Sequence, residues 1–181
     1  FPQLIHYAIN ILKRCYSQIM ESNVLHNKNI KSIEPLPSPT HYWRNYPVTQ
    51  IIQKQITEYR QLIEDILMHR DQRLLVIVGP CSIHDPEAGI EYAEKLKKIS
   101  EPFSDQMMIA MRVYFEKPRT ALGWKGYIND PNLNDTFDVK LGLSKAREFL
   151  LQIAEIGLPA ATEYLDPFTP QFLGDFVSWG A

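Results

Sequence analysis

Residues 74–86 read Leu-Leu-Val-Ile-Val-Gly-Pro-Cys-Ser-Ile-His-Asp-Pro, and this stretch decides the fold. The five apolar residues 74–78, followed by Gly-Pro, are typical of a strand in a parallel sheet that is buried on both faces. Asp85-Pro86 is typical of a helix N-cap with proline at the first helical position. The stretch therefore predicts a strand, a polar loop and a helix in succession.

The same alternation continues to the end of the chain. It predicts strands over 107–115 and 159–165, helices over 141–156 (stopped by Gly157) and 169–177 (capped by Thr169-Pro170), and a fourth strand entered near Trp179. Strands and helices in this order form a parallel sheet with right-handed crossovers. We predict an α/β fold: about the first three βα units of a (β/α)8 TIM barrel, because a closed barrel takes about 250 residues.

A helical N-terminal extension is predicted ahead of these units. Residues 1–21 carry an amphipathic pattern with a short a/d seam, which suits packing on the body of the protein or a helix pair or oligomer contact. Residues 22–47 contain four prolines and are predicted as a loop, and a second helix is predicted over 48–69. The expected domains are therefore 1–72, the N-terminal helical extension, and 73–181, the N-terminal part of the barrel.

Composition indicates a cytoplasmic enzyme that acts on small molecules. The chain is 45% hydrophobic and 22% charged with a net charge of −2, which gives no electrostatic reason to expect nucleic acid or a membrane as partner. Cys15 and Cys81 match no zinc or disulfide framework, and neither a membrane span nor a signal peptide is expected. The missing initiator Met suggests a piece of a longer protein.

Polar side chains cluster where the predicted strands end. Arg112, Lys117 and Arg119 place three cations within eight positions, enough to hold a phosphate or carboxylate, although a solvated pairing with Glu116 is the simpler alternative. Cys81 offers a thiol as nucleophile or metal ligand. Glu163 ends the third strand. In parallel α/β barrels such loops carry the catalytic groups, so the spacing indicates an enzyme.

Three motifs resemble the class I, microbial type of 3-deoxy-D-arabino-heptulosonate 7-phosphate (DAHP) synthase. They are Val-Gly-Pro-Cys-Ser-Ile-His-Asp-Pro over 78–86, Arg-Val-Tyr-Phe-Glu-Lys-Pro-Arg-Thr over 112–120 and Gly-Trp-Lys-Gly-Tyr-Ile-Asn-Asp-Pro over 123–131. The resemblance covers roughly residues 29–181 and is strongest from Arg73 onward. It implies the first step of the shikimate pathway to the aromatic amino acids.

The resemblance also implies roles for individual residues. Cys81 would be a ligand of a divalent metal ion such as Mn²⁺ or Fe²⁺, whose other ligands come from later strands. Arg112 and Lys117 would bind the carboxylate end of phosphoenolpyruvate. The run of Lys117, Pro118, Arg119 and Thr120 would receive erythrose 4-phosphate. For Glu163 we expect either an anchor for the lysine and arginine side chains or a group that positions water. His84 is expected to be hydrogen-bonded locally, and Trp124 and Lys125 to shape the loop.

The implied reaction is an aldol-like condensation of phosphoenolpyruvate with erythrose 4-phosphate, which releases phosphate. An aromatic amino acid would act as feedback inhibitor, and the intact enzyme would be a homo-oligomer, dimer or tetramer. Two alternatives remain at this point. One is the sister synthase that uses a pentose phosphate. The other is a truncated, non-catalytic chain that only binds anions or full-length subunits.

Overall fold

The computed structural model describes residues 28–30, 32–119 and 121–181, which form parts of two compact units, 1–36 and 37–181. The described residues of the first unit are exposed and irregular. The predicted helix over 1–21, Cys15 and Thr120 lie outside the described residues. The proposed domain boundary at 72/73 stays a prediction. No helix in the described part of the chain is long and apolar enough to cross a membrane.

The second unit is built on a four-stranded parallel sheet in the order β1-β2-β3-β4, which confirms the α/β prediction. The register places Leu74 opposite Met107 and Met111 opposite Ala160. A bulge interrupts the pairing of β3 with β4 between Ala160 and Ala161. The strands span Leu74–Val78 (β1), Met107–Arg112 (β2), Ala160–Thr162 (β3) and Val177–Gly180 (β4).

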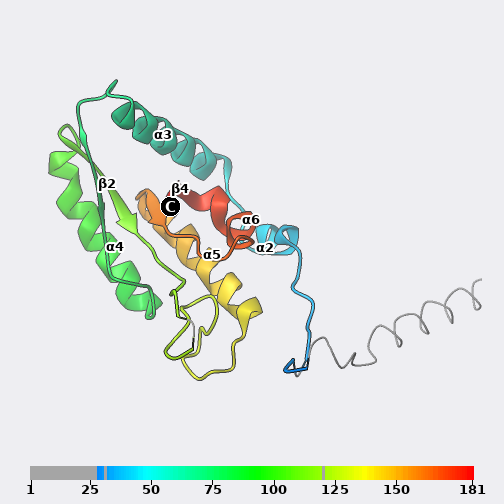
Figure 1. The fold of residues 1–181 in the computed structure, drawn as a ribbon. Coiled ribbons are helices and arrows are strands. Elements are labelled where there is room, and N and C mark those ends of the chain that lie inside the picture. Colours follow the sequence, from blue (N-terminus) through cyan, green and yellow to red (C-terminus); the bar gives the residue numbers. More distant parts are fainter. Residues whose placement is uncertain (1–27, 31, 120) are drawn as a thin grey trace, which may run out of the picture. The chain divides into compact units, whose positions relative to one another are not determined.

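Helices alternate with these strands from β1 onward, as the sequence predicts, and α3 precedes them (Figure 1). Asp85 caps α4 through a hydrogen bond from the Ala88 amide, and Gly157 ends α5 with a φ of 83°, a conformation that suits glycine. The helices are α2 (Pro39–Asn45), α3 (Gln50–Leu67), α4 (Pro86–Ser100), α5 (Val139–Ile156) and α6 (Thr169–Leu173), with 3₁₀ turns η1 (Glu101–Phe103) and η2 (Gly174–Phe176).

Several local predictions were wrong. The strand over 74–78 is not buried on both faces, because Leu74, Ile77 and Val78 are exposed. β2 and β3 are shorter than the predicted strands over 107–115 and 159–165.

Helix α2 lies in the region predicted as a loop, because Pro39 stands in its first turn, where proline is tolerated. Thr169 does not cap α6: the helix begins at Thr169 itself, and its hydroxyl binds Glu116 instead. The last helix ends at Leu173 rather than Val177, and β4 starts at Val177 after a 3₁₀ turn.

Long-range hydrogen bonds join α3 to the sheet. Arg60 on α3 donates to the carbonyl of Val177 at 3.0 Å and to that of Gly174 at 2.6 Å. Tyr59 donates to the carbonyl of Gly157 at 2.9 Å. All three bonds join residues more than 90 positions apart, so α3 is part of the same packed body as the βα units.

A single hydrophobic core lies between the helices and the strands. It includes Met111 and Val113 from β2 and its extension, and Phe149, Leu150 and Ile153 from α5, all at most 2% exposed. The polar loop between β2 and α5, residues 113–138, gathers beyond the carboxyl end of β2 (Figure 1). The core therefore fixes the strands, and their carboxyl ends carry the loops in which the site residues lie.

Candidate active site

The loop after β1 is fixed to the end of β2 by close backbone approach and by Arg112. A Cβ at Gly79 would lie 2.5 Å from the carbonyl oxygen of Arg112, so only glycine fits there without displacing β2. The Arg112 guanidinium donates to the carbonyl of Pro80 at 3.2 Å and to that of Cys81 at 3.1 Å. Its carbon also lies 4.6 Å from the centroid of the Tyr114 ring. Arg112 therefore holds the Cys81 loop in place.

Lys117 brings its ammonium group to Cys81. The Lys117 Nζ lies 3.1 Å from the Cys81 carbonyl oxygen and 3.1 Å from its Sγ. Hydrogen bonding and charge from Lys117, with a smaller effect of Arg112, lower the pKa of the exposed Cys81 thiol. The structure thus brings three of the predicted site residues together, around a thiol that ionises more readily than an isolated one.

The loop that follows folds back onto the extension of β2. The Lys117 amide donates to the carbonyl of Lys125 at 3.0 Å, and the Ile128 amide donates to that of Phe115 at 3.3 Å. Gly126 has a φ of 104°, and a Cβ there would meet the Phe115 carbonyl and the Glu116 backbone. Only glycine therefore permits this close crossing.

Trp124 and Lys125 keep the loop in this shape. The Trp124 indole donates to the Asp130 carbonyl at 2.8 Å, and the Lys125 Nζ donates to the Arg119 carbonyl at 2.7 Å. Both side chains bond to the backbone of their own loop, which agrees with the shaping role expected for them.

A cavity of about 510 Å³ lies beside this loop. Its volume is within the range of small-molecule sites. Lys117, Arg119 and Lys125 give it three cations against the two carboxyl groups of Glu116 and Asp166, a balance that suits an anionic ligand. The lining residues are Glu116, Lys117, Pro118, Arg119, Lys125, Asn129, Phe137, Val139, Leu165 and Asp166.

Glu163 and Glu116 differ from their sequence-based interpretations. Glu163 directly follows β3 and is half-buried. It is not one of the described residues that line the cavity. Glu116, interpreted as a possible solvated partner of the cations, is only 3% exposed. Its carboxylate accepts hydrogen bonds from the Leu165 amide at 3.2 Å and from the Thr169 hydroxyl at 3.1 Å. The sequence analysis therefore missed that Glu116 is a buried carboxyl group, which lines the same cavity as the cations.

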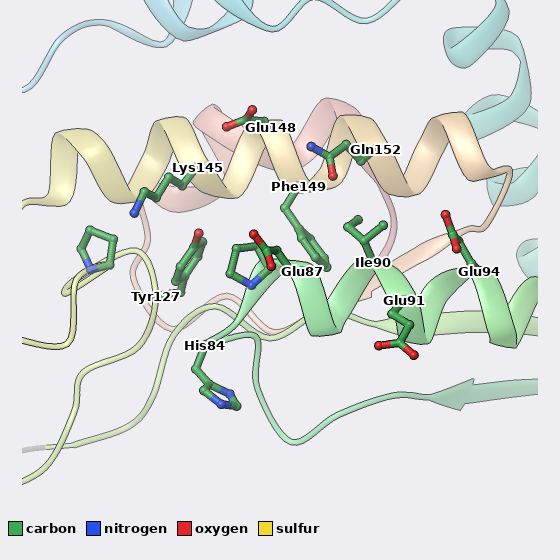
Figure 2. Close-up of a pocket in the computed structure, with 12 residues that line it drawn as sticks. His84, Glu87, Ile90, Glu91, Glu94, Tyr127, Lys145, Glu148, Phe149 and Gln152 are labelled. Carbon is green, nitrogen blue, oxygen red and sulfur yellow. The ribbon is translucent and has the colours of Figure 1, made fainter.

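A second cavity, of about 570 Å³, lies between α4 and α5 (Figure 2). His84 is among its lining residues. Glutamates from both helices line it, and among its described lining residues Lys145 is the one lysine or arginine. This excess of negative charge disfavours a phosphorylated ligand, so the first cavity is the better candidate for anionic substrates. The glutamates are Glu87, Glu91, Glu94 and Glu148.

The described residues do not assemble a metal site by themselves. Across 28–181, leaving out 31 and 120, no group of three or more His, Cys, Asp or Glu side chains is placed to hold an ion. A single thiolate does not hold a divalent ion, because stable sites use several ligands. Cys81 therefore fits one ligand position, and the described residues do not complete the set.

Comparison with known proteins identifies the family. Residues 48–181 match the model of the DAHP synthetase I family. The chain belongs to this family. It is 48% identical over 162 residues to the Tyr-sensitive phospho-2-dehydro-3-deoxyheptonate aldolase of Escherichia coli, which covers 90% of this chain and 46% of the relative. It is 50% identical over 149 residues to the Trp-sensitive enzyme of E. coli, which covers 82% of this chain and 43% of the relative.

Further relatives support the same assignment. The enzyme of the same name from Amycolatopsis methanolica is 48% identical over 160 residues, covering 88% of this chain and 79% of that protein. The structure of the aldolase from Francisella tularensis has a TM-score of 0.81 and 44% identity, covering 83% of this chain and 44% of that one. The chain thus spans about half the length of the E. coli relatives that it matches.

Proposed function

We propose that this chain is part of an enzyme that condenses phosphoenolpyruvate with erythrose 4-phosphate to give DAHP and phosphate. The observation that carries the proposal is the Lys117 ammonium, held between Cys81 and the cationic cavity at the carboxyl ends of the strands. Family membership and the relatives' name, an aldolase for phospho-2-dehydro-3-deoxyheptonate, support it. Two anionic substrates require such a concentration of positive charge.

In this proposal the cations hold two substrates, and Lys117 serves both. Arg112 and Lys117 hold the carboxylate end of phosphoenolpyruvate through charge-assisted hydrogen bonds. Lys117, Pro118, Arg119 and Thr120 receive erythrose 4-phosphate. Glu163 holds the cationic side chains or positions water. Bringing two anions together opposes their repulsion, so positioning is the main contribution of these residues.

The reaction makes one carbon–carbon bond. The enol carbon of phosphoenolpyruvate attacks the aldehyde carbon of erythrose 4-phosphate, whose oxygen takes up a proton. Water then adds at the adjacent carbon, and phosphate leaves with cleavage of the carbon–oxygen bond. The described residues offer cations for the carboxylate of phosphoenolpyruvate and for the phosphate of erythrose 4-phosphate, which stays on the sugar throughout.

The Cys81 thiolate supplies one ligand of a divalent metal ion, Mn²⁺ or Fe²⁺, in the intact enzyme. A metal in such a site would polarise the aldehyde oxygen. Since the described residues provide only this ligand, no step above is assigned to the metal.

Three further properties belong to the intact enzyme in this proposal. The four strands are the first part of a (β/α)8 barrel, which the parallel order β1-β2-β3-β4 supports. The enzyme is a cytoplasmic homo-oligomer, dimer or tetramer. An aromatic amino acid inhibits it, a proposal supported by the Tyr-sensitive and Trp-sensitive relatives.

Kinetics of the intact enzyme test the proposed division of the substrates. Arg112→Ala and Lys117→Ala should each lower kcat/KM for phosphoenolpyruvate about 10- to 150-fold, the equivalent of one lost charge-assisted hydrogen bond. Arg119→Ala should mainly raise KM for erythrose 4-phosphate. Phosphate release is measured with erythrose 4-phosphate and, in parallel, with a five-carbon sugar phosphate.

Lys98→Ala, on the exposed face of α4, is the matched control and should leave the kinetics unchanged. Arg119→Ala raising KM for phosphoenolpyruvate alone would show that the two anions are assigned the wrong way round. Preference for the five-carbon sugar would favour the sister synthase.

The 181-residue polypeptide expressed by itself should be inactive and should self-associate. Within the described residues, β1 pairs only with β2 and β4 only with β3, and Leu74 on β1 is 64% exposed. Unpaired strand edges with exposed apolar side chains favour association. Light scattering after size-exclusion chromatography measures this, and Leu74→Lys should reduce it. A monomeric polypeptide that forms DAHP would contradict the prediction.

A further inference from the structure

Glu116 is a buried carboxyl group that joins two loops. It is 3% exposed and lies in the loop after β2. Its Oε2 accepts from the Leu165 amide at 3.2 Å, and its Oε1 accepts from the Thr169 hydroxyl at 3.1 Å. Leu165 follows β3 and Thr169 begins α6. The carboxyl therefore connects the loop after β2 to the segment that leads from β3 into α6. Burial of a carboxyl is costly, and a site that keeps one usually uses it.

The position of Glu116 in the chain links it to the cationic loop. Lys117 is the next residue, and the backbone of Phe115 and Lys117 is hydrogen-bonded to residues 125–128. The Glu116 carboxyl accepts from Thr169, and the Lys117 ammonium donates to Cys81. Holding Glu116 therefore restrains the backbone from which Lys117 reaches its partner.

Burial makes Glu116 responsive near neutral pH. Burial, with the neighbouring Asp166 carboxyl, raises the pKa of Glu116 to about 7. Glu116 also acts on Tyr164, on the β3 side. Lys117, Arg119 and Lys125 line the same cavity as Glu116. Its ionised form therefore adds negative charge beside the cations proposed to hold the substrates.

We propose that Glu116 is the positioning residue of the cationic loop: its carboxyl ties residues 116–119 to the start of α6 and so sets where Lys117 and Arg119 meet their anionic ligands. This inference rests on the proposed function. Ionisation of Glu116 above neutral pH weakens anion binding, because its charge opposes the ligand and repels Asp166. Protonation removes both effects and leaves the carboxyl able to bind the same two partners.

Variants of the intact enzyme separate the tie from the charge. Glu116→Gln replaces the carboxyl with an amide of the same shape that is neutral at every pH. Glu116→Ala removes the hydrogen bonds to Leu165 and Thr169. Binding of phosphoenolpyruvate without the aldehyde is followed by intrinsic tryptophan fluorescence at pH 6 and pH 8, and KM and kcat are measured in the same buffers. Glu155→Gln, on the exposed side of α5, is the matched control.

For each protein we compare the dissociation constant for phosphoenolpyruvate at pH 8 with that at pH 6. This ratio should be about threefold to thirtyfold larger for the unmodified enzyme than for Glu116→Gln, the effect of one charge within the cavity. Comparing the two proteins cancels the titration of the ligand's own phosphate. Glu116→Ala should bind weakly at both pH values, with KM changed more than kcat. Glu155→Gln should behave as the unmodified enzyme.

Equal pH dependence in the unmodified enzyme and Glu116→Gln would overturn the inference, and so would full affinity in a folded Glu116→Ala. If the alanine variant does not fold, the Gln comparison still decides. An unmodified enzyme that binds phosphoenolpyruvate but makes no DAHP would refute the proposed function instead, because the binding readout does not depend on turnover.

Discussion

Arg147→Ala is expected to lower the free energy of unfolding by about 3–5 kcal/mol, because it empties the space of a fully buried side chain and leaves two backbone carbonyls without their donor. Arg147 on α5 is fully buried, and its guanidinium binds the Asp175 carboxylate at 2.7 and 3.0 Å. It also donates to the carbonyl of Tyr46 at 2.8 Å and to that of Phe172. One side chain thus joins α5 to the segment after α2 and to the α6–η2 segment.

Chemical denaturation monitored by circular dichroism measures this loss. Arg147→Lys keeps the charge but not the planar fork, so it should recover only part of the stability. Lys145→Ala, two residues away on the same helix and partly exposed, is the matched control and should change stability by less than about 0.5 kcal/mol. A loss as small as the control's for Arg147→Ala would show that the Tyr46 and Phe172 carbonyls find other donors.

The order of strands and helices could be predicted because local signals and tertiary packing agree. Residues 74–78 are apolar without interruption, and Asp85-Pro86 and Gly157 mark helix ends by chemistry that acts within a few residues. Where a residue's partner is distant in sequence, the prediction failed. The Thr169 hydroxyl resembles a cap in sequence, but Glu116, more than fifty positions earlier, takes its hydrogen bond.

The candidate site could be predicted in part for the same reason. Cys81, Arg112 and Lys117 lie next to strand ends, and parallel strands bring those ends together. Glu116 looked like a surface partner of the cations because charge alternates along the sequence there. Its burial depends on Leu165 and Thr169 from the β3–α6 segment, and no spacing within residues 112–120 reveals them.

Replacement of Cys81 is expected to have the largest effect on activity. In the intact enzyme Cys81→Ala should lose bound metal and lower kcat by more than about 100-fold. Removing only a hydrogen-bond partner of a metal ligand already costs up to about 100-fold in activity, and loss of the ligand itself should cost more. The thiol is exposed and contributes little packing, so the fold should be retained. Lys117 and Arg112 keep their bonds to the Cys81 carbonyl in the variant, because that group belongs to the backbone.

Metal content after loading with Mn²⁺, measured by elemental analysis alongside kcat and circular dichroism, separates the ligand role from a structural one. Cys81→Ser is the matched control for side-chain size, and it too should lose metal, since a hydroxyl is far less acidic than a thiol whose pKa Lys117 lowers. Retention of metal and turnover by either variant would show that Cys81 is not a metal ligand. Its sulfur would then be a nucleophile or only a hydrogen-bond partner of Lys117. Loss of turnover with full metal content would instead place the sulfur at the substrate.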